Sequence, residues 1–216
     1  MSMMKDEDRK YVNELFEKNL ANEVNIVLFV DAKEQCMYCE ETKALMEELA
    51  ALSPKLKLTV YDIKAHRKEA ALLGMDKVPS MTLWGKSNYG IYYFGIPAGH
   101  EFAALLEDIV DVSKGASRLQ QGTKEKLKKV NKPIDIKVFI TPTCPYCPRA
   151  VRTAHQLAIE NKNIRAEMIE AMEFEALSNK YGVMAVPKIV INDTVSFEGA
   201  LPEDAFMEYV LEAAAK

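Results

Sequence analysis

Two kinds of segment that direct a chain to a membrane are missing from this sequence. No stretch is apolar for long enough to span a bilayer. Residues 1–10 are charged from Lys5 onward and lack the positive stretch followed by an apolar core that marks a secretory signal. We therefore expect a cytoplasmic protein that does not enter a membrane.

Concentrated charge of one sign is also missing. The chain has 28 Lys and Arg residues against 32 Asp and Glu residues, for a formal net charge of −4. No extended basic patch is present, which excludes a nucleic-acid-binding surface of the usual kind. With 49% hydrophobic residues over 216 positions, the chain is long enough for two small globular domains.

Cysteine is scarce, and none is left over for a structural bridge. The four cysteines form two Cys-X-X-Cys pairs, Cys36/Cys39 and Cys144/Cys147. Close pairs in a cytoplasmic chain are typical of redox chemistry or of metal binding. A shared zinc site is disfavoured because the pairs lie too far apart for zinc-ribbon spacing and the three histidines have no metal-like spacing. We expect no metal and no cofactor besides the redox-active disulfides.

The two cysteine pairs belong to an internal repeat. Positions 36 and 144 differ by 108, and the dipeptides Val78-Pro79 and Val186-Pro187 differ by the same 108. Each cysteine pair is therefore followed by a Val-Pro at one fixed distance. A common offset for two separate landmarks indicates a tandem duplication.

Strand and helix patterns surround these landmarks in both halves. An apolar run precedes each cysteine pair, an apolar helical face follows it, and a hairpin pattern follows each Val-Pro. In the first half, strands are expected at 24–30, 56–63, 80–84 and 90–94 and helices at 12–20, 64–73 and 102–109, with another helix starting at the cysteines. In the second half, strands are expected at 134–140, 165–169, 188–191 and 195–197, with a cysteine-bearing helix and a closing helix at 206–213.

A polar, lysine-rich segment, 113–133, separates the halves. We place the boundary near Arg118, which divides the chain into units 1–118 and 119–216. Residues 123–130 are expected to form a short helix that opens the second unit, although a flexible tether is the alternative. The α/β pattern predicts a mixed central sheet flanked by helices in each unit.

Each cysteine pair is placed where a strand turns into a helix. Such a cysteine faces unpaired backbone N–H groups and the positive end of the helix dipole. Both favour the nucleophilic thiolate and can lower a thiol pKa from about 8.5 to roughly 3.5–7.5. Cys36 and Cys144 are therefore the expected nucleophiles. Cys39 and Cys147, one helical turn on, are the expected resolving thiols that attack the mixed disulfide.

Each half resembles the thioredoxin and glutaredoxin superfamily in three features: a strand, a Cys-X-X-Cys on the helix that follows it, and a later X-Pro before a hairpin. The resemblance implies that the peptide bonds of Val78-Pro79 and Val186-Pro187 are cis and that the backbone beside them pairs with an extended substrate. The alternative is that each proline merely starts an edge strand. Residues 144–147 (CPYC) are of glutaredoxin type, whereas 36–39 (CMYC) are less usual. Residues 94–102 (FGIPAGHEF) resemble the glutaredoxin-like protein disulfide oxidoreductases of hyperthermophiles.

That family resemblance implies a tandem pair of thioredoxin-fold units and a thiol-disulfide oxidoreductase that acts on protein disulfides or dithiols. Reduction and oxidation are the implied activities, with isomerisation of protein disulfides as a further one. The resemblance also implies a flavoprotein resembling thioredoxin reductase as the electron source. Two other interpretations stay open: an electron donor that serves peroxidases or ribonucleotide reductase, and a chaperone-like module that holds unfolded chains in an apolar groove around the Val-Pro segments.

Charge predicts that the two sites differ. Around the first pair, acidic and basic residues are mixed: Asp31, Lys33, Glu34, Glu40, Glu41 and Lys43. Arg149 and Arg152 flank the second pair, and we expect no acid near them. Because positive charge favours thiolate, Cys144 is expected to be the more acidic nucleophile and its pair the stronger oxidant. Screening of exposed charges would reduce this difference.

Two positions depart from the superfamily pattern. Thioredoxins carry a buried Asp on the strand before the cysteines, where this chain has Val30 and Val138, so proton transfer requires another group or water. Glutaredoxins usually carry Gly-Gly after the last strand, where glutathione binds. This chain has Glu198-Gly199-Ala200 there, and the negative charge of Glu198 disfavours an anionic ligand such as glutathione.

Overall fold

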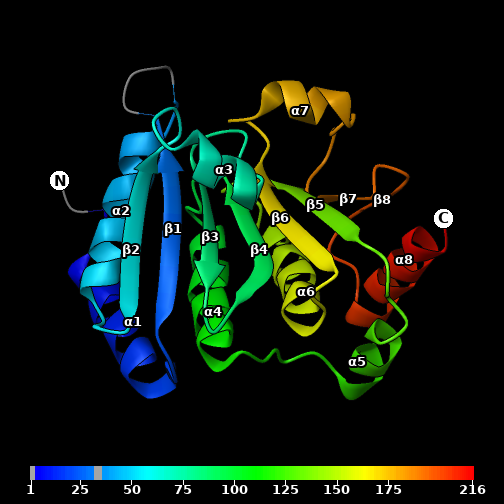
Figure 1. The fold of residues 1–216 in the computed structure, drawn as a ribbon, viewed down its shortest axis with the longest axis horizontal. Coiled ribbons are helices and arrows are strands. Elements are labelled where there is room, and N and C mark those ends of the chain that lie inside the picture. The colour runs from blue at the N-terminus through cyan, green and yellow to red at the C-terminus, as the bar shows by residue number, and fades with distance from the viewer. Residues whose placement is uncertain (1–2, 32–35) are drawn as a thin grey trace.

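The computed structural model of the protein describes residues 3–31 and 36–216, and its elements follow the order expected from the repeat. The first half contains α1 (Asp6–Asn19), β1 (Val24–Val30), α2 (Cys39–Ala51), β2 (Leu56–Asp62), α3 (Arg67–Leu73), β3 (Ser80–Trp84), β4 (Asn88–Phe94) and α4 (Glu101–Lys114). The second half contains α5 (Gln121–Leu127), β5 (Ile134–Ile140), α6 (Cys147–Glu160), β6 (Ile164–Glu170), α7 (Glu175–Lys180), β7 (Lys188–Ile191), β8 (Val195–Glu198) and α8 (Glu203–Ala215). Figure 1 shows these elements in chain order from blue to red.

Most element boundaries differ from the sequence expectation by a few residues, and two of the differences have a clear cause. The short helix expected at 123–130 is α5, which begins at Gln121 and ends at Leu127. Thr123 and Leu127 are buried, so packing against the second unit determines where this helix lies. The strand expected at 90–94 begins two residues earlier because Asn88 pairs with Trp84 across the hairpin.

All eight strands form one sheet, in the order β2-β1-β3-β4-β6-β5-β7-β8. In each half, two strands are parallel and a hairpin adds two antiparallel neighbours. The halves meet where β4 and β6 pair in parallel, from Ile91 opposite Ala166 to Phe94 opposite Ile169. The mixed sheet expected for each unit is therefore continuous across the whole molecule.

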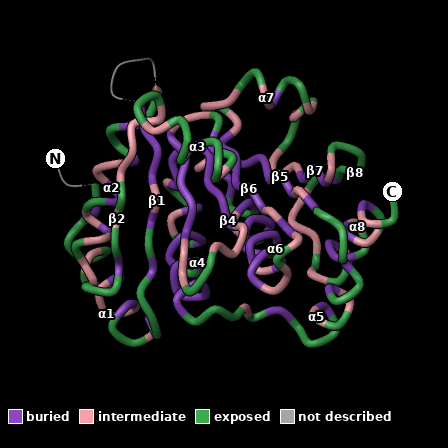
Figure 2. The backbone as a smooth tube through the Cα atoms, viewed as in Figure 1, coloured by how far each residue is buried: buried purple, intermediate pink, exposed green. Residues whose placement is uncertain are grey.

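Helices cover both faces of this sheet. Figure 1 shows α3 in front of the sheet and α4 and α6 behind it. Side chains alternate along β1, so that Leu28 packs into the larger core and Phe29 into the smaller core under α3 and α7. The central strands are the most buried part of the backbone (Figure 2). Within the described residues, every helix is too short or too polar to cross a bilayer.

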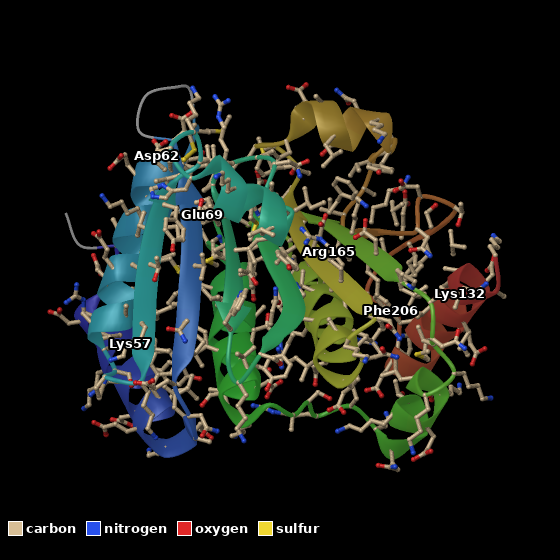
Figure 3. All side chains as sticks on the ribbon, in the orientation of Figure 1. Lys57, Asp62, Glu69, Lys132, Arg165 and Phe206 are labelled. Carbon is tan, nitrogen blue, oxygen red and sulfur yellow. A yellow bond between two sulfur atoms is a disulfide. The ribbon has the colours of Figure 1, made fainter. Side chains whose placement is uncertain are left out.

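Specific contacts join the two halves along the β4–β6 junction. The guanidinium of Arg165, labelled on β6 in Figure 3, lies 3.5 Å above the ring of Tyr92 on β4. It also donates hydrogen bonds to the carbonyl groups of Leu73 and Gly74 at 3.1 Å. Gly90 has φ of 76°, and a Cβ there would lie 2.4 Å from the carbonyl oxygen of Ile164. Only glycine fits this close approach of the two strands.

The strand directions place both cysteine pairs at the same end of the sheet, where the carboxyl ends of β1 and β5 lie. β1 and β5 run the same way, because two antiparallel pairings and two parallel pairings connect them through β3, β4 and β6. Each cysteine pair follows the carboxyl end of one of these strands. At roughly 4.8 Å per strand spacing, the two strands lie about 19 Å apart.

Candidate active site

Both cysteine pairs are disulfides located at helix N-termini. Cys36 is bonded to Cys39 and Cys144 to Cys147, with Cα–Cα distances of 5.5 Å and 5.6 Å. The second cysteine of each pair is the first residue of its helix, α2 or α6. The first cysteine lies before the helix, where the free N–H groups of the first turn face it.

The two sulfurs of each pair differ in exposure. Cys39 and Cys147 are buried, with 3% and 0% of their surface exposed. Cys36 is partly exposed and Cys144 is 8% exposed. The intervening Tyr146 is 71% exposed, so the second disulfide lies just beneath the surface. A thiol or disulfide of another protein reaches the first sulfur of each pair more readily than the second.

Hydrogen bonds to the sulfurs distinguish the two sites. At the second site, the backbone N–H of Cys147 donates to Sγ of Cys144 at 3.2 Å. At the first site, the N–H of Asp31 donates to Sγ of Cys39 at 3.4 Å. An N–H donor stabilises a thiolate. At the second site the donor acts on Cys144, the expected nucleophile, whereas at the first site it acts on Cys39, the expected resolving cysteine. This difference favours a more acidic Cys144.

The charge pattern expected for the second site is wrong in one respect. The expectation of no nearby acid fails because Arg152 is buried, with 8% of the residue exposed, and its guanidinium donates hydrogen bonds to Asp108 and Asp111 of α4. It also lies 3.3 Å from Glu107. These acids approach only through the packing of α4 against α6, so local sequence cannot show them. Arg149 remains exposed and has no ion pair within the described residues.

The charges at the first site are described only in part. Lys33 and Glu34 lie outside the described residues. Asp31 is 7% exposed, and its carboxylate lies 3.1 Å from Nζ of Lys64. The first pair therefore has a nearby acid that is itself paired with a lysine.

His155 belongs to the same buried cluster as Arg152. Its Nδ1 lies 2.6 Å from the Asp108 carboxylate, which also accepts a hydrogen bond from the Tyr93 hydroxyl. His155, Asp108 and Tyr93 are all fully buried. Burial, and then the positive charge of Arg152, lowers the pKa of His155 to about 3, so the ring is neutral at physiological pH. The histidine is thus structural: it joins α6 to α4 across the two halves.

Both Val-Pro peptide bonds are cis. The carbonyl oxygen of Val186 lies 3.7 Å from Sγ of Cys144. The carbonyl groups of Pro79 and Pro187 accept matching hydrogen bonds at 2.8 Å, from the N–H groups of Gly95 and Gly199. The same hairpin contact thus recurs in both units, and in the second unit the dipeptide lies against the cysteine pair.

A buried acid next to the second site was not found from the sequence. Glu101 is fully buried, and both of its carboxylate oxygens lack a hydrogen-bond partner among the described residues. Burial raises its pKa to about 8. The preceding N–H, of His100, donates to the carbonyl of Pro142 at 3.0 Å, which holds the start of α4 beside the segment leading to Cys144. In a sequence, a Glu in the first turn of a helix ordinarily indicates only helix stabilisation. The one hint of a role for Glu101 was its place within residues 94–102, the segment that resembles the protein disulfide oxidoreductases.

No group of three or more His, Cys, Asp or Glu side chains within residues 3–31 and 36–216 is arranged to hold a metal ion.

Comparison with known proteins gives matches over nearly the whole chain as well as over its second half. A family model described as a thioredoxin domain matches residues 134–212. The crystal structure of a protein disulfide oxidoreductase from Aeropyrum pernix K1 is 35% identical, with a TM-score of 0.91 over 98% of this chain and 94% of that chain. The alkylhydroperoxide reductase protein AhpF from Enterococcus faecalis is 25% identical, with a TM-score of 0.87 over 95% of this chain and 98% of that chain.

Curated relatives are much longer than this chain. An NADH dehydrogenase from Bacillus subtilis is 29% identical over 79% of this chain and 31% of its own length. The corresponding alkyl hydroperoxide reductase protein from Staphylococcus aureus is 30% identical over 71% of this chain and 28% of its own length. The chain thus spans less than a third of the length of these relatives.

Proposed function

The chain belongs to the protein disulfide oxidoreductase family of the thioredoxin superfamily, and from that premise we propose that it exchanges disulfides with protein substrates at two sites, one in each unit. The observation that carries the proposal is the repeated arrangement of a disulfide at a helix N-terminus with a cis Val-Pro in the same unit. Both disulfides lie at the same end of one sheet, so a single substrate surface can meet both.

Reduction of a substrate disulfide begins with the thiolate of the more accessible cysteine of a pair. Sγ of Cys144 forms a bond to one substrate sulfur as the substrate S–S bond breaks, and the released substrate thiolate takes up a proton. The thiolate of Cys147 then attacks Sγ of Cys144, which releases the second substrate thiol and leaves the enzyme disulfide. Two electrons pass from the enzyme to the substrate. Cys36 and Cys39 perform the same steps in the first unit, and the reverse sequence oxidises a substrate dithiol.

The Val-Pro segments provide a backbone to which an extended substrate can pair. Within the described residues, the N–H and C=O groups of Val78 and Val186 form no hydrogen bond with another main-chain group. An extended segment that lies along such a backbone gains main-chain hydrogen bonds without regard to its side chains. Val78, Pro79, Val186 and Pro187 are therefore the proposed substrate-binding residues.

Glu101 is the proposed proton donor and acceptor of the second site. The position that carries a buried Asp in thioredoxins is Val138, so the strand itself supplies no titratable group. Because its pKa is about 8, Glu101 is mostly protonated at pH 7, and an acid of this strength can both give up and take up a proton there. An acid that titrates near the working pH is suited to both directions of the reaction.

The wider setting of the protein is also part of the proposal. We retain the division into units 1–118 and 119–216, which falls in the segment between α4 and α5. The protein acts in the cytoplasm, uses its disulfides without another cofactor, and receives electrons from a flavoprotein resembling thioredoxin reductase. The negative charge of Glu198 after the last strand disfavours glutathione as a substrate.

A second candidate function is supported by the names of two relatives. Alkyl hydroperoxide reductase proteins of this name resemble the chain in sequence over 71% of its length and in fold over 95% of its length. Such a likeness fits a chain that passes electrons to a peroxide-reducing partner. Reduction potentials distinguish the candidates, because an electron donor requires strongly reducing disulfides and an oxidase or isomerase less reducing ones.

Trapping of the mixed disulfide tests the assigned roles. In a chain whose first pair is replaced by serine, Cys147→Ser is expected to accumulate a covalent adduct with a disulfide-containing protein, because the resolving thiol is absent. Cys144→Ser in the same background is the matched control and is expected to form none. Non-reducing gel electrophoresis and mass spectrometry of the adduct measure this. An adduct formed through Cys147 in the control would contradict the assignment.

A further inference from the structure

A groove lies between the two disulfide sites. It encloses about 570 Å³, and its lining includes Met37 and Tyr38 from the first Cys-X-X-Cys together with Pro142, two residues before Cys144. Met37 is 59% exposed, and Met172, also in the lining, is 69% exposed. Flexible thioether side chains adapt to differently shaped apolar groups. The groove therefore offers an adaptable apolar surface beside the first disulfide and close to the segment that leads to the second.

The groove also contains a buried carboxylate with an unused oxygen. Glu170, at the carboxyl end of β6, lines the groove yet is only 2% exposed. Its Oε2 accepts a hydrogen bond from the N–H of Glu173 at 2.6 Å. Its Oε1 has no partner among the described residues. A buried carboxylate oxygen without a donor is unfavourable unless a ligand supplies one.

Three further carboxylates surround Glu170. Glu41 and Glu175 also line the groove, one from each unit. Glu173 lies beside it: Oε1 accepts a hydrogen bond from the N–H of Ile96 at 2.6 Å, and Oε2 has no partner in the described chain. Burial raises the pKa of Glu173 to about 7, and the charges of Glu170 and Glu41 add to this effect.

Among the described residues, no cation is paired with these carboxylates: none of the four forms an ion pair with Lys, Arg or His. Repulsion among them disfavours an acidic segment in the groove. A Lys or Arg side chain, by contrast, brings both the hydrogen-bond donors and the positive charge that the site lacks.

We propose that this groove selects substrate segments in which a Lys or Arg side chain accompanies the reacting cysteine. The cationic head lies between Glu41 and Glu175 at the rim and points toward the buried Glu170, and the aliphatic stem packs on Met37 and Met172. The inference rests on the proposed exchange activity and adds the class of substrate to it.

Two disulfide-linked peptides that differ only in one residue beside the cysteine, Arg or Gln, test the proposal with the full chain. We expect kcat/KM to be about tenfold higher for the Arg peptide, the factor that one charge-assisted hydrogen bond supplies. Glu170→Gln is expected to remove most of this preference, mainly through KM. Glu175→Gln, an exposed change that does not threaten folding, is expected to give a smaller decrease in the same direction.

Glu212→Gln on α8 is the matched control and is expected to keep the wild-type ratio. Added salt should reduce the preference in the wild type, because screening weakens the charge contact. Equal kcat/KM for both peptides, or a higher kcat/KM for the Gln peptide, overturns the inference and leaves the proposed function intact. Exchange of neither peptide contradicts the proposed function itself.

Discussion

Asp108 is expected to hold the two halves of the molecule together. Its carboxylate bonds to Arg152 and His155 of α6 and to Tyr93 of β4, and it is fully buried. Asp108→Ala leaves the Tyr93 hydroxyl and His155 without their acceptor, while Asp111 and Glu107 still face Arg152. Removing one partner of a buried ion pair costs about 3–5 kcal/mol, and we expect a loss of this size in the free energy of unfolding.

Urea denaturation of the oxidised protein measures this loss. A lower midpoint with an unchanged m-value indicates reduced stability without a change in the surface exposed on unfolding. Asp108→Asn keeps the shape and one acceptor oxygen, so its loss should be smaller. Lys18→Ala breaks the exposed Glu14–Lys18 pair and should cost no more than about 0.5 kcal/mol. A loss for Asp108→Ala as small as this control would refute the structural role.

Two further predictions concern titration. The pKa of Glu101 is about 8 in the native state against 4.5 in an unfolded chain, so the native state binds the carboxyl proton more tightly. The free energy of unfolding should therefore fall as pH rises from about 4.5 to 8. Glu101→Gln should flatten this profile in urea denaturation at several pH values; an unchanged slope would contradict it. In single-pair variants, pH-dependent alkylation should give Cys144 a lower pKa than Cys36, because the N–H of Cys147 donates to its sulfur. A lower pKa for Cys36 than for Cys144 would refute the role given to this hydrogen bond.

The repeat allowed most of the local structure to be predicted from the sequence. The periodicity of apolar residues located the strands and helices, and the common 108-residue offset separated two units. These features are local, or are repeated at a fixed spacing, so one chain suffices to find them. The pairing of β4 with β6 had no such signal, because Gly90 is required only once Ile164 lies beside it.

The electrostatics of the sites were harder to predict. Arg152 was expected to act on Cys144, yet it is bonded to Asp108 and Asp111, which are distant in sequence. Glu101 lies in an ordinary first helical turn, and only burial gives it a raised pKa. A pKa depends on desolvation and on groups from other elements, so the sequence around a cysteine indicates its chemistry but not its acidity.

Exchange by single-pair variants tests most directly whether each unit houses a complete site. Replacing Cys36 and Cys39 by serine leaves one pair, and replacing Cys144 and Cys147 leaves the other. Turnover of a protein disulfide should persist in both variants and be absent when all four cysteines are replaced. If removal of either pair alone abolished turnover, the two disulfides would form one site and the account of two separate sites would be wrong.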